Sequence, residues 1–332
     1  MFAMKRVTAL VASGAALGLI AFAGVSLSPA GIPEQQMSAK LTTPNLTEPV
    51  DAALKPCGPL LSVDHQPFAA SAHTRTLATS YAKPWRNFRR MNVPASDLPG
   101  IVKLEPEVDI SPTEVAKGHC SATRISTEWF VTAAHCVSEG YDRVYLKAGS
   151  EQLSSDAIRS VKVDFAVCHG GFGTSSDQFD NDIALLKVAE EDLNLIDAVP
   201  VVSWGHTSTP FSTVRFRTAR VGGWGLMSFG GELSDHLQKM ELDIFSIEKK
   251  LIRISSRAGR GPCIGDSGGP LIVEDDGKPV LMGVLSTVAT NRQGEMCAGN
   301  YMSSYTNLST YRDWAINTMV ACEQNADACK RT

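Results

Sequence analysis

The stretch Gly265-Asp266-Ser267-Gly268-Gly269-Pro270 runs directly into the apolar segment Leu271-Ile272-Val273. Glycine, proline and small polar residues in this order are typical of a tight turn before a buried strand. Glycine lets the backbone reverse sharply and point successive N–H groups at one position. A serine in such a turn has an exposed hydroxyl with N–H donors beside it, as a nucleophile of acyl transfer requires. Taken alone, however, the stretch favours an ordinary β-turn.

Two upstream segments change this interpretation. They are Thr132-Ala133-Ala134-His135-Cys136 and Asp180-Asn181-Asp182-Ile183-Ala184-Leu185-Leu186. With the serine turn they give the chain order His, Asp, Ser, and all three resemble segments of the trypsin/chymotrypsin family of serine endopeptidases. The resemblance extends over about 101–320 and includes four shorter matches: Gly223-Trp224-Gly225, Leu237-Gln238-Lys239, Tyr305-Thr306 and Tyr311-Arg312-Asp313-Trp314.

The pattern of short apolar runs between turn signals predicts an all-β protein, either a barrel or a sandwich. The expected strands are 101–104, 129–132, 144–146, 183–188, 199–204 and 280–286. The resemblance implies two six-stranded antiparallel β-barrels with the active site between them, with His135 and Asp182 in the first barrel and Ser267 in the second. It also implies a closing C-terminal α-helix, for which 310–320 is the candidate.

The resemblance implies a catalytic triad of His135, Asp182 and Ser267. His135 would take the Ser267 proton during attack and return it to the leaving amine, while Asp182 would hold the imidazole in the right tautomer. Asp180 is a local alternative, but the Asp-Ile-Ala-Leu-Leu motif selects Asp182. The backbone N–H groups of Gly265 and Ser267 would form the oxyanion hole.

The substrate pocket is expected beside Ser267. Trypsins carry an aspartate six positions before the catalytic serine, and this chain has Gly261 there. Without that carboxylate a buried substrate cation would be unpaired, so we predict no cleavage after Arg or Lys. On the wall strand, Ser286 would hydrogen-bond the substrate backbone and Val288 would narrow the pocket mouth, with Ser303 on the opposite wall. We expect cleavage after small or medium aliphatic residues.

Asp266 raises the question of activation. In the zymogen branch of the family this carboxylate pairs with a new α-amino group, which activation cleavage releases. The usual Ile-Val-Gly-Gly start is absent, and counting back places the expected start within 89–93, so cleavage after Arg90 is one hypothesis. The alternative is that this segment resembles the N-terminal arm of bacterial glutamyl endopeptidases, which depend less on such a pair. Those enzymes normally have a wall-strand histidine where this chain has Leu285.

The N-terminus has the features of a signal peptide over 1–30. Lys5 and Arg6 precede an apolar run over 7–25, and either Ser28-Pro29-Ala30 or Ala21-Phe22-Ala23 is the candidate small-residue cleavage site. An uncleaved membrane anchor is the alternative, since the run is almost long enough to span a bilayer. Residues 31–90 carry scattered prolines without periodicity and are expected to be a pro-segment or linker, with the protease domain over 91–332. The mature protein would be secreted or periplasmic, with no membrane contact after signal cleavage.

Export to an oxidising compartment favours disulfides among the eight cysteines. The resemblance implies two of the pairs: Cys120–Cys136 and Cys263–Cys297. The other four cysteines allow three connectivities, of which we favour Cys57–Cys168 and Cys322–Cys329. Metal ligation by the adjacent Cys-His pairs at 119–120 and 168–169 is an alternative that suits zinc poorly, because a C-x-x-C spacing is missing. We therefore expect no metal and no cofactor.

Composition is that of an ordinary globular protein, with 332 residues, 43% hydrophobic and 20% charged. A net charge of −4 gives no sign of a nucleic-acid surface. The predicted partners are protein or peptide substrates, with protein inhibitors as further candidates and no nucleic acid. The predicted function is a secreted serine endopeptidase. The alternative is a catalytically silent homologue that binds a partner through the same double barrel, although such proteins usually lose a triad member.

Overall fold

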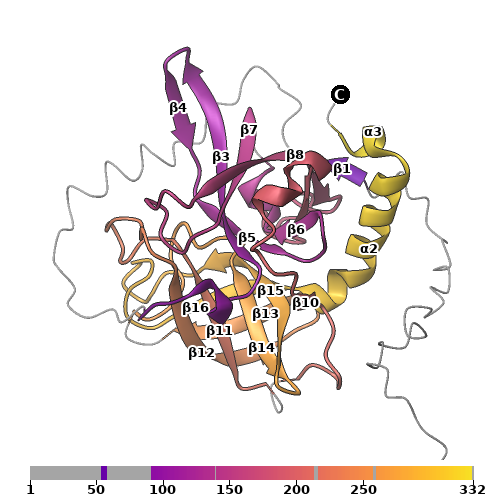
Figure 1. Cartoon of the computed structure of the whole chain (residues 1–332). Coiled ribbons are helices and arrows are strands. Elements are labelled where there is room, and N and C mark those ends of the chain that lie inside the picture. The colour runs from indigo at the N-terminus through magenta and orange to yellow at the C-terminus, as the bar shows by residue number, and fades with distance from the viewer. Residues whose placement is uncertain (1–53, 58–90, 139, 213–215, 257–258, 331–332) are drawn as a thin grey trace, which may run out of the picture. The chain divides into compact units, whose positions relative to one another are not determined.

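The computed structural model describes residues 54–57, 91–138, 140–212, 216–256 and 259–330 (Figure 1), all within one compact unit. The predicted signal peptide over 1–30 lies outside the described residues, as does the predicted pro-segment apart from 54–57. None of the helices in the described part has the length and apolar character needed to cross a bilayer.

Six strands close the first barrel in the order β8-β7-β3-β5-β6-β9, since β8 also pairs with β9. Their bounds are β3 Ile101–Ser111, β5 Cys120–Arg124, β6 Trp129–Thr132, β7 Arg143–Ala148, β8 Arg159–His169 and β9 Ala184–Val188. Along β8 burial alternates with period two from Val161 to Val167, as expected for a strand with one face on a core. Two shorter strands extend this sheet: β1 Leu54–Pro56 beside β8, and β4 Glu114–Lys117 beside β3.

The second barrel closes in the same way, in the order β15-β14-β11-β12-β13-β16. Its strands are β11 Thr218–Gly223, β12 Gln238–Ile247, β13 Leu251–Ser256, β14 Pro270–Asp275, β15 Lys278–Val288 and β16 Tyr301–Asn307. The short strands β2 Met91–Asn92 and β10 Ser203–Trp204 pair with β12 and β15. The predicted pair of six-stranded antiparallel barrels is therefore confirmed (Figure 1).

The C-terminal helix is also confirmed and is longer than predicted. It runs as α2 over Leu308–Gln324 and is followed by the short helix α3 over Ala326–Cys329. Asn307 ends β16 and caps α2, because its side-chain oxygen accepts the Ser309 N–H at 3.2 Å. Three short 3-10 helices complete the secondary structure of the described residues: η3 Ala95–Asp97, η4 Ala134–Cys136 and η5 Glu190–Leu195.

The predicted strand over 199–204 is wrong except for Ser203–Trp204. Pro200 has no N–H to give to a ladder. The guanidinium of Arg124 takes the place of a strand partner, since it donates to the carbonyl oxygens of Ile196 and Val199 at 2.9 and 2.7 Å. The Val202 N–H in turn donates to the Arg124 carbonyl. Hydrogen bonds to the side chain and the backbone of Arg124 therefore satisfy this segment outside a sheet.

One apolar cluster joins the two barrels. Its buried members come from β6 and β9 of the first barrel, from β14 and β15 of the second, and from α2; they include Trp129, Leu185, Ile272, Leu281 and Tyr311. Hydrogen bonds cross the same boundary. Among them, the Ser121 N–H donates to the Ser267 carbonyl, and the Thr306 hydroxyl to the Asp182 carbonyl, both at 2.7 Å. The segments that carry His135, Asp182 and Ser267 all lie along this boundary.

All eight cysteines form disulfides: Cys57–Cys168, Cys120–Cys136, Cys263–Cys297 and Cys322–Cys329. These are the four pairs favoured from the sequence. The first of them fastens the short strand β1 to β8, with 111 residues between its two cysteines. A strand in this stretch was not predicted, because the prolines around it suggested only an irregular linker.

Candidate active site

His135 lies in the 3-10 turn η4, directly after β6. Its backbone N–H donates to Asp182 Oδ1 at 2.9 Å, and its Nδ1 lies 2.7 Å from Asp182 Oδ2. Because a carboxylate only accepts, Nδ1 must carry the proton, and Nε2 is left as the basic nitrogen. The ring of Phe179 packs edge-on against the imidazole at 5.7 Å. These contacts fix the ring while about a quarter of the side chain stays exposed (24%).

Asp182 is completely buried at the start of the segment that leads into β9. Besides the two bonds from His135, it accepts the Ser286 hydroxyl at 2.6 Å. Three donors thus compensate a carboxylate that burial would otherwise strongly destabilise. The nearby Asp180 faces elsewhere and accepts Lys250 Nζ at 2.8 and 2.9 Å. The structure therefore brings Asp182, and not Asp180, to the imidazole.

Ser267 is half-buried in the turn before β14. The next residue, Gly268, has φ +71°, and a Cβ there would lie 2.2 Å from Thr132 Oγ1 and 2.3 Å from the Ser121 carbonyl oxygen. Only glycine allows this approach, which brings the serine turn against the segment that leads to His135. Within the described part of the chain, the Ser267 hydroxyl makes no hydrogen bond to the imidazole. Catalytic pairs often tighten only when substrate binds.

Asp266 lies under the same turn and is 1% exposed. Its two carboxylate oxygens accept the N–H groups of Gly225 and Cys263 at 2.7 and 2.9 Å. A Cβ at Gly223 or Gly225 would lie 2.7 or 2.6 Å from this carboxyl group, which explains the two glycines of the Gly-Trp-Gly motif. Asp266 lies between Gly265 and Ser267, whose N–H groups are the expected oxyanion donors. Its two hydrogen bonds therefore fix this turn to the backbone of Gly225 and Cys263.

The predicted pocket residue Gly261 has little free space in front of it. A Cβ at this position would lie 2.0 Å from Ser256 Oγ and 2.5 Å from the Tyr301 hydroxyl. Ser256 and Tyr301 pair across β13 and β16 and were missed by the sequence analysis. Neither residue lies in a motif that could have identified it, because only the register of β13 and β16 brings the two residues to Gly261.

The other predicted pocket residues lie on β15 and β16. Val288 pairs with Ser303, which is fully buried, and Ser286 is bound to Asp182 as described above. A cavity of about 250 Å³ adjoins this strand. Its lining comes from the loop before β9 and from β13, β15 and β16: Asp177, Phe179, Leu251, Arg253, Ser286, Thr287 and Ser304. Since Phe179 packs against His135 and Ser286 donates to Asp182, this cavity borders the candidate site.

One group of potential metal ligands is present among the described residues. The ligand atoms of Cys120, His135 and Cys136 lie within 4.8 Å of one another. Both sulfurs belong to the Cys120–Cys136 disulfide, so neither is available as a thiolate. Cys168 of the other Cys-His pair is bonded to Cys57 in the same way.

Two closed six-stranded β-barrels with the candidate site at their boundary are the fold of the trypsin-like serine proteases. The structure aligns with that of neuropsin, a serine protease expressed in the limbic system of mouse brain, with a TM-score of 0.54 and 23% identity, over 69% of this chain and 98% of that one. At this identity the likeness carries the fold alone.

The family itself follows from the sequence comparison. The Trypsin family model matches residues 108–315, more than half of the chain, and the chain belongs to this family of serine proteases. It is 28% identical over 211 residues to coagulation factor IX of Cavia porcellus, covering 59% of this chain and 71% of that protein. It is 25% identical over 225 residues to a collagenase of Hypoderma lineatum (65% and 82%) and 29% identical over 217 residues to trypsin-1 of Astacus astacus (59% and 85%).

Proposed function

We propose that this protein is an active serine endopeptidase whose catalytic triad is Ser267, His135 and Asp182. The observation that carries the proposal is the pair of hydrogen bonds from His135 to the buried Asp182. These bonds leave Nε2 as the basic nitrogen of a side chain that is 24% exposed. The chain also belongs to a family of serine proteases. The serine turn packs against the same segment.

In the proposed reaction the Ser267 oxygen bonds to the substrate carbonyl carbon while its proton moves to His135 Nε2. The carbonyl π electrons move to oxygen, and the N–H groups of Gly265 and Ser267 stabilise that oxyanion. When the intermediate collapses, the C–N bond breaks and the imidazolium gives its proton to the leaving amine. Water then attacks the acyl-enzyme by the same steps and releases Ser267.

We also propose that the enzyme cleaves after small or medium aliphatic residues and not after Arg or Lys. The hydroxyls of Ser256 and Tyr301 fill the position that a side chain at residue 261 would take, which favours a shallow pocket. Val288 adds bulk at the mouth, and no carboxylate stands at position 261 to pair a substrate cation. Proteins or peptides are the substrates that the family implies.

The proposed location is outside the cytoplasm, with a signal peptide over 1–30, a pro-segment or linker over 31–90 and the protease domain over 91–332. Four disulfides support an oxidising compartment. Mass spectrometry of the N-terminus of the exported protein checks these boundaries, and a start within 1–20 would contradict the signal peptide.

The experiment that tests activity is labelling of the purified protein with a fluorophosphonate, in which the serine oxygen displaces fluoride from phosphorus. We expect the wild type to be labelled at Ser267 and to cleave a peptide library. Ser267→Ala should abolish labelling and lower turnover by about 10⁶-fold. Absence of labelling in the folded wild type would instead support the silent homologue. Cleavage mainly after Arg or Lys would leave the activity standing and overturn the proposed specificity.

A further inference from the structure

A lysine is buried beside the candidate site without an obvious purpose. Lys103 lies on β3 and is 2% exposed. Its Nζ is buried and makes no hydrogen bond within the described part of the chain. A buried ammonium group is costly unless a negative charge compensates it, so its surroundings must explain it.

The register of the sheet shows which way Lys103 faces. Its neighbours Val102 and Leu104 belong to the core of the first barrel, so Lys103 is on the outer face. It pairs directly with Ser121 on β5, and the side chains of such a pair stand on the same face. The Ser121 N–H donates to the Ser267 carbonyl at 2.7 Å. The turn of the second barrel that carries Ser267 therefore covers this face.

The carboxylate on this face is Asp266. The ideal Cβ position of Gly223 lies 2.7 Å from Asp266 Oδ1 and 3.0 Å from Ser121 Oγ, so these two oxygens face the same small space. The negative charge of Asp266 favours the charged form of Lys103 and so acts to raise its pKa. The Ser121 hydroxyl, like Lys103 Nζ, has no hydrogen-bond partner among the described residues.

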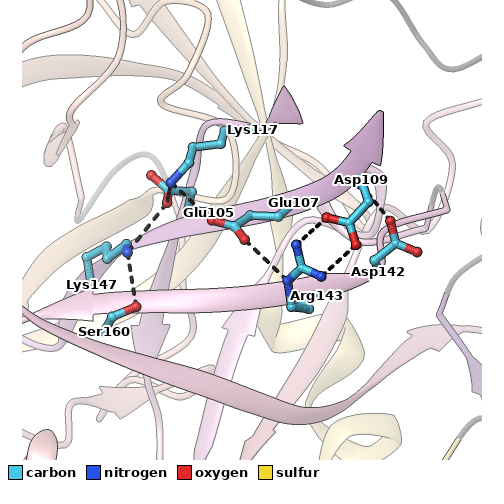
Figure 2. Close-up of polar contacts among 8 residues, drawn as sticks. All are labelled: Glu105, Glu107, Asp109, Lys117, Asp142, Arg143, Lys147 and Ser160. Carbon is cyan, nitrogen blue, oxygen red and sulfur yellow. Dashed lines mark hydrogen bonds and ion pairs between the residues drawn. The ribbon is translucent and has the colours of Figure 1, made fainter. Parts of the chain in front are cut away.

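A second carboxylate near Lys103 is already engaged. Figure 2 shows Glu105, two residues along β3, between Lys117 and Lys147. Their Nζ atoms lie 2.7 and 3.5 Å from Glu105 Oε1. The exposed Lys117 and the partly exposed Lys147 thus share Glu105, which leaves Asp266 as the buried carboxylate toward which the Lys103 charge is directed.

The ionisation of Lys103 agrees with this arrangement. Burial lowers the pKa of Lys103 to about 8, while the negative charges of Asp266 and then Glu105 oppose the lowering. Desolvation of its ring, together with the positive charge of Lys103, lowers the pKa of His119 to about 4. His119 is therefore neutral near pH 7, where Lys103 still carries its proton.

We infer that Lys103 is a positioning residue that supplies, from inside the folded chain, the positive charge facing Asp266. Through Asp266 it holds the turn that presents Gly265 and Ser267, and a newly released α-amino group is not required there. A second ammonium brought to the same space would be repelled by the first. The inference rests on the proposed endopeptidase function, and it makes the uncleaved chain competent for catalysis.

The test compares fluorophosphonate labelling rates of wild type, Lys103→Met and Lys147→Met from pH 6 to pH 10. Lys147 also pairs with Lys103 across the sheet but is partly exposed, so Lys147→Met is the matched control. We expect wild type and control to lose reactivity as pH rises through about 8, where Lys103 releases its proton. Folded Lys103→Met should label about 10- to 100-fold more slowly at pH 7, within the range for loss of an oxyanion donor, and should lack this alkaline decline.

Two outcomes overturn the inference. One is a folded Lys103→Met protein with the wild-type rate and the wild-type alkaline decline. The other needs no variant: selective acetylation of the α-amino group of the active wild type should leave its labelling rate unchanged, and loss of labelling would assign the charge to the chain terminus. A wild type that never labels contradicts the proposed function instead, so the two failures are distinguishable.

Discussion

Two buried aspartates stand on either side of the candidate site, and they are compensated in different ways. Asp182 accepts from the side chains of His135 and Ser286 and from one backbone N–H. Asp266 accepts from two backbone N–H groups, and its charge favours the protonated form of the buried Lys103. In the proposed mechanism the first carboxylate acts on a base, and in the inference above the second acts on a turn. The comparison of the two would therefore separate the control of proton transfer from the control of backbone shape.

Among the changes that probe the two aspartates, the largest effect is expected from Asp182→Asn. An amide in this place presents a donor to Nδ1 and selects the wrong tautomer, so kcat should fall by about 10⁴-fold with little change in KM. Steady-state kinetics on a peptide substrate measure this. Asp180→Asn is the matched control, because Asp180 pairs with Lys250, and it should stay within about threefold of wild type. Equal losses in both variants would contradict the assignment of Asp182.

Asp266→Asn should have the next largest effect. It keeps the shape of the side chain but removes the charge that holds the turn, so kcat should fall by about 10²- to 10³-fold through the oxyanion hole. The NMR resonance of the His135 Nδ1 proton, which lies in the hydrogen bond to Asp182, should not change, whereas it should change in Asp182→Asn. A changed Nδ1 proton resonance in Asp266→Asn would mean that the two aspartates do not act separately.

Ser286→Ala tests the donor set of Asp182 alone. The variant removes one of three donors to a buried carboxylate, which costs about 1.5–3 kcal/mol, or roughly 10-fold or more in kcat if the cost falls on the transition state. Thermal unfolding measured beside the kinetics divides the cost between stability and turnover. An unchanged kcat with unchanged stability would show that His135 alone suffices for Asp182.

The smallest effect is expected from Ser121→Ala, on the side of Asp266. The Ser121 hydroxyl makes no hydrogen bond in the described part of the structure, so its removal should change stability by less than about 0.5 kcal/mol. The labelling rate at pH 7 should stay within about twofold of wild type. A loss as large as that of Lys103→Met would mean that the hydroxyl relays the lysine charge to Asp266.

The difference between the two aspartates also explains what could be predicted from the sequence. The segments around His135, Asp182 and Ser267 are local motifs, and the short apolar runs of strands such as β6 and β9 are local patterns, so both were accessible. The burial of Lys103 was not accessible, because the alternation of its strand places it between two core residues and predicts a side chain that faces solvent. It is buried only because a turn more than 150 residues later covers that face.

Contacts between distant residues also explain why the pocket residues and the irregular segment around Pro200 were not predicted. Ser256 and Tyr301 reach Gly261 through a cross-strand register that no nearby residue announces. The apolar residues around Pro200 had the composition of a strand. The carbonyl oxygens of Ile196 and Val199, however, accept hydrogen bonds from the Arg124 side chain instead of from a neighbouring strand. In each case a contact between distant parts of the chain decided the outcome, which local propensity does not encode.

The bond between Cys57 and Cys168 has a consequence for maturation. A peptide bond broken anywhere over 58–90 would divide the polypeptide, yet the two fragments would stay covalently joined through β1 and β8. Such a nicked protein would migrate as one band on a non-reducing gel and as two after thiol treatment. The leading fragment would then travel with the enzyme wherever it goes, rather than being discarded.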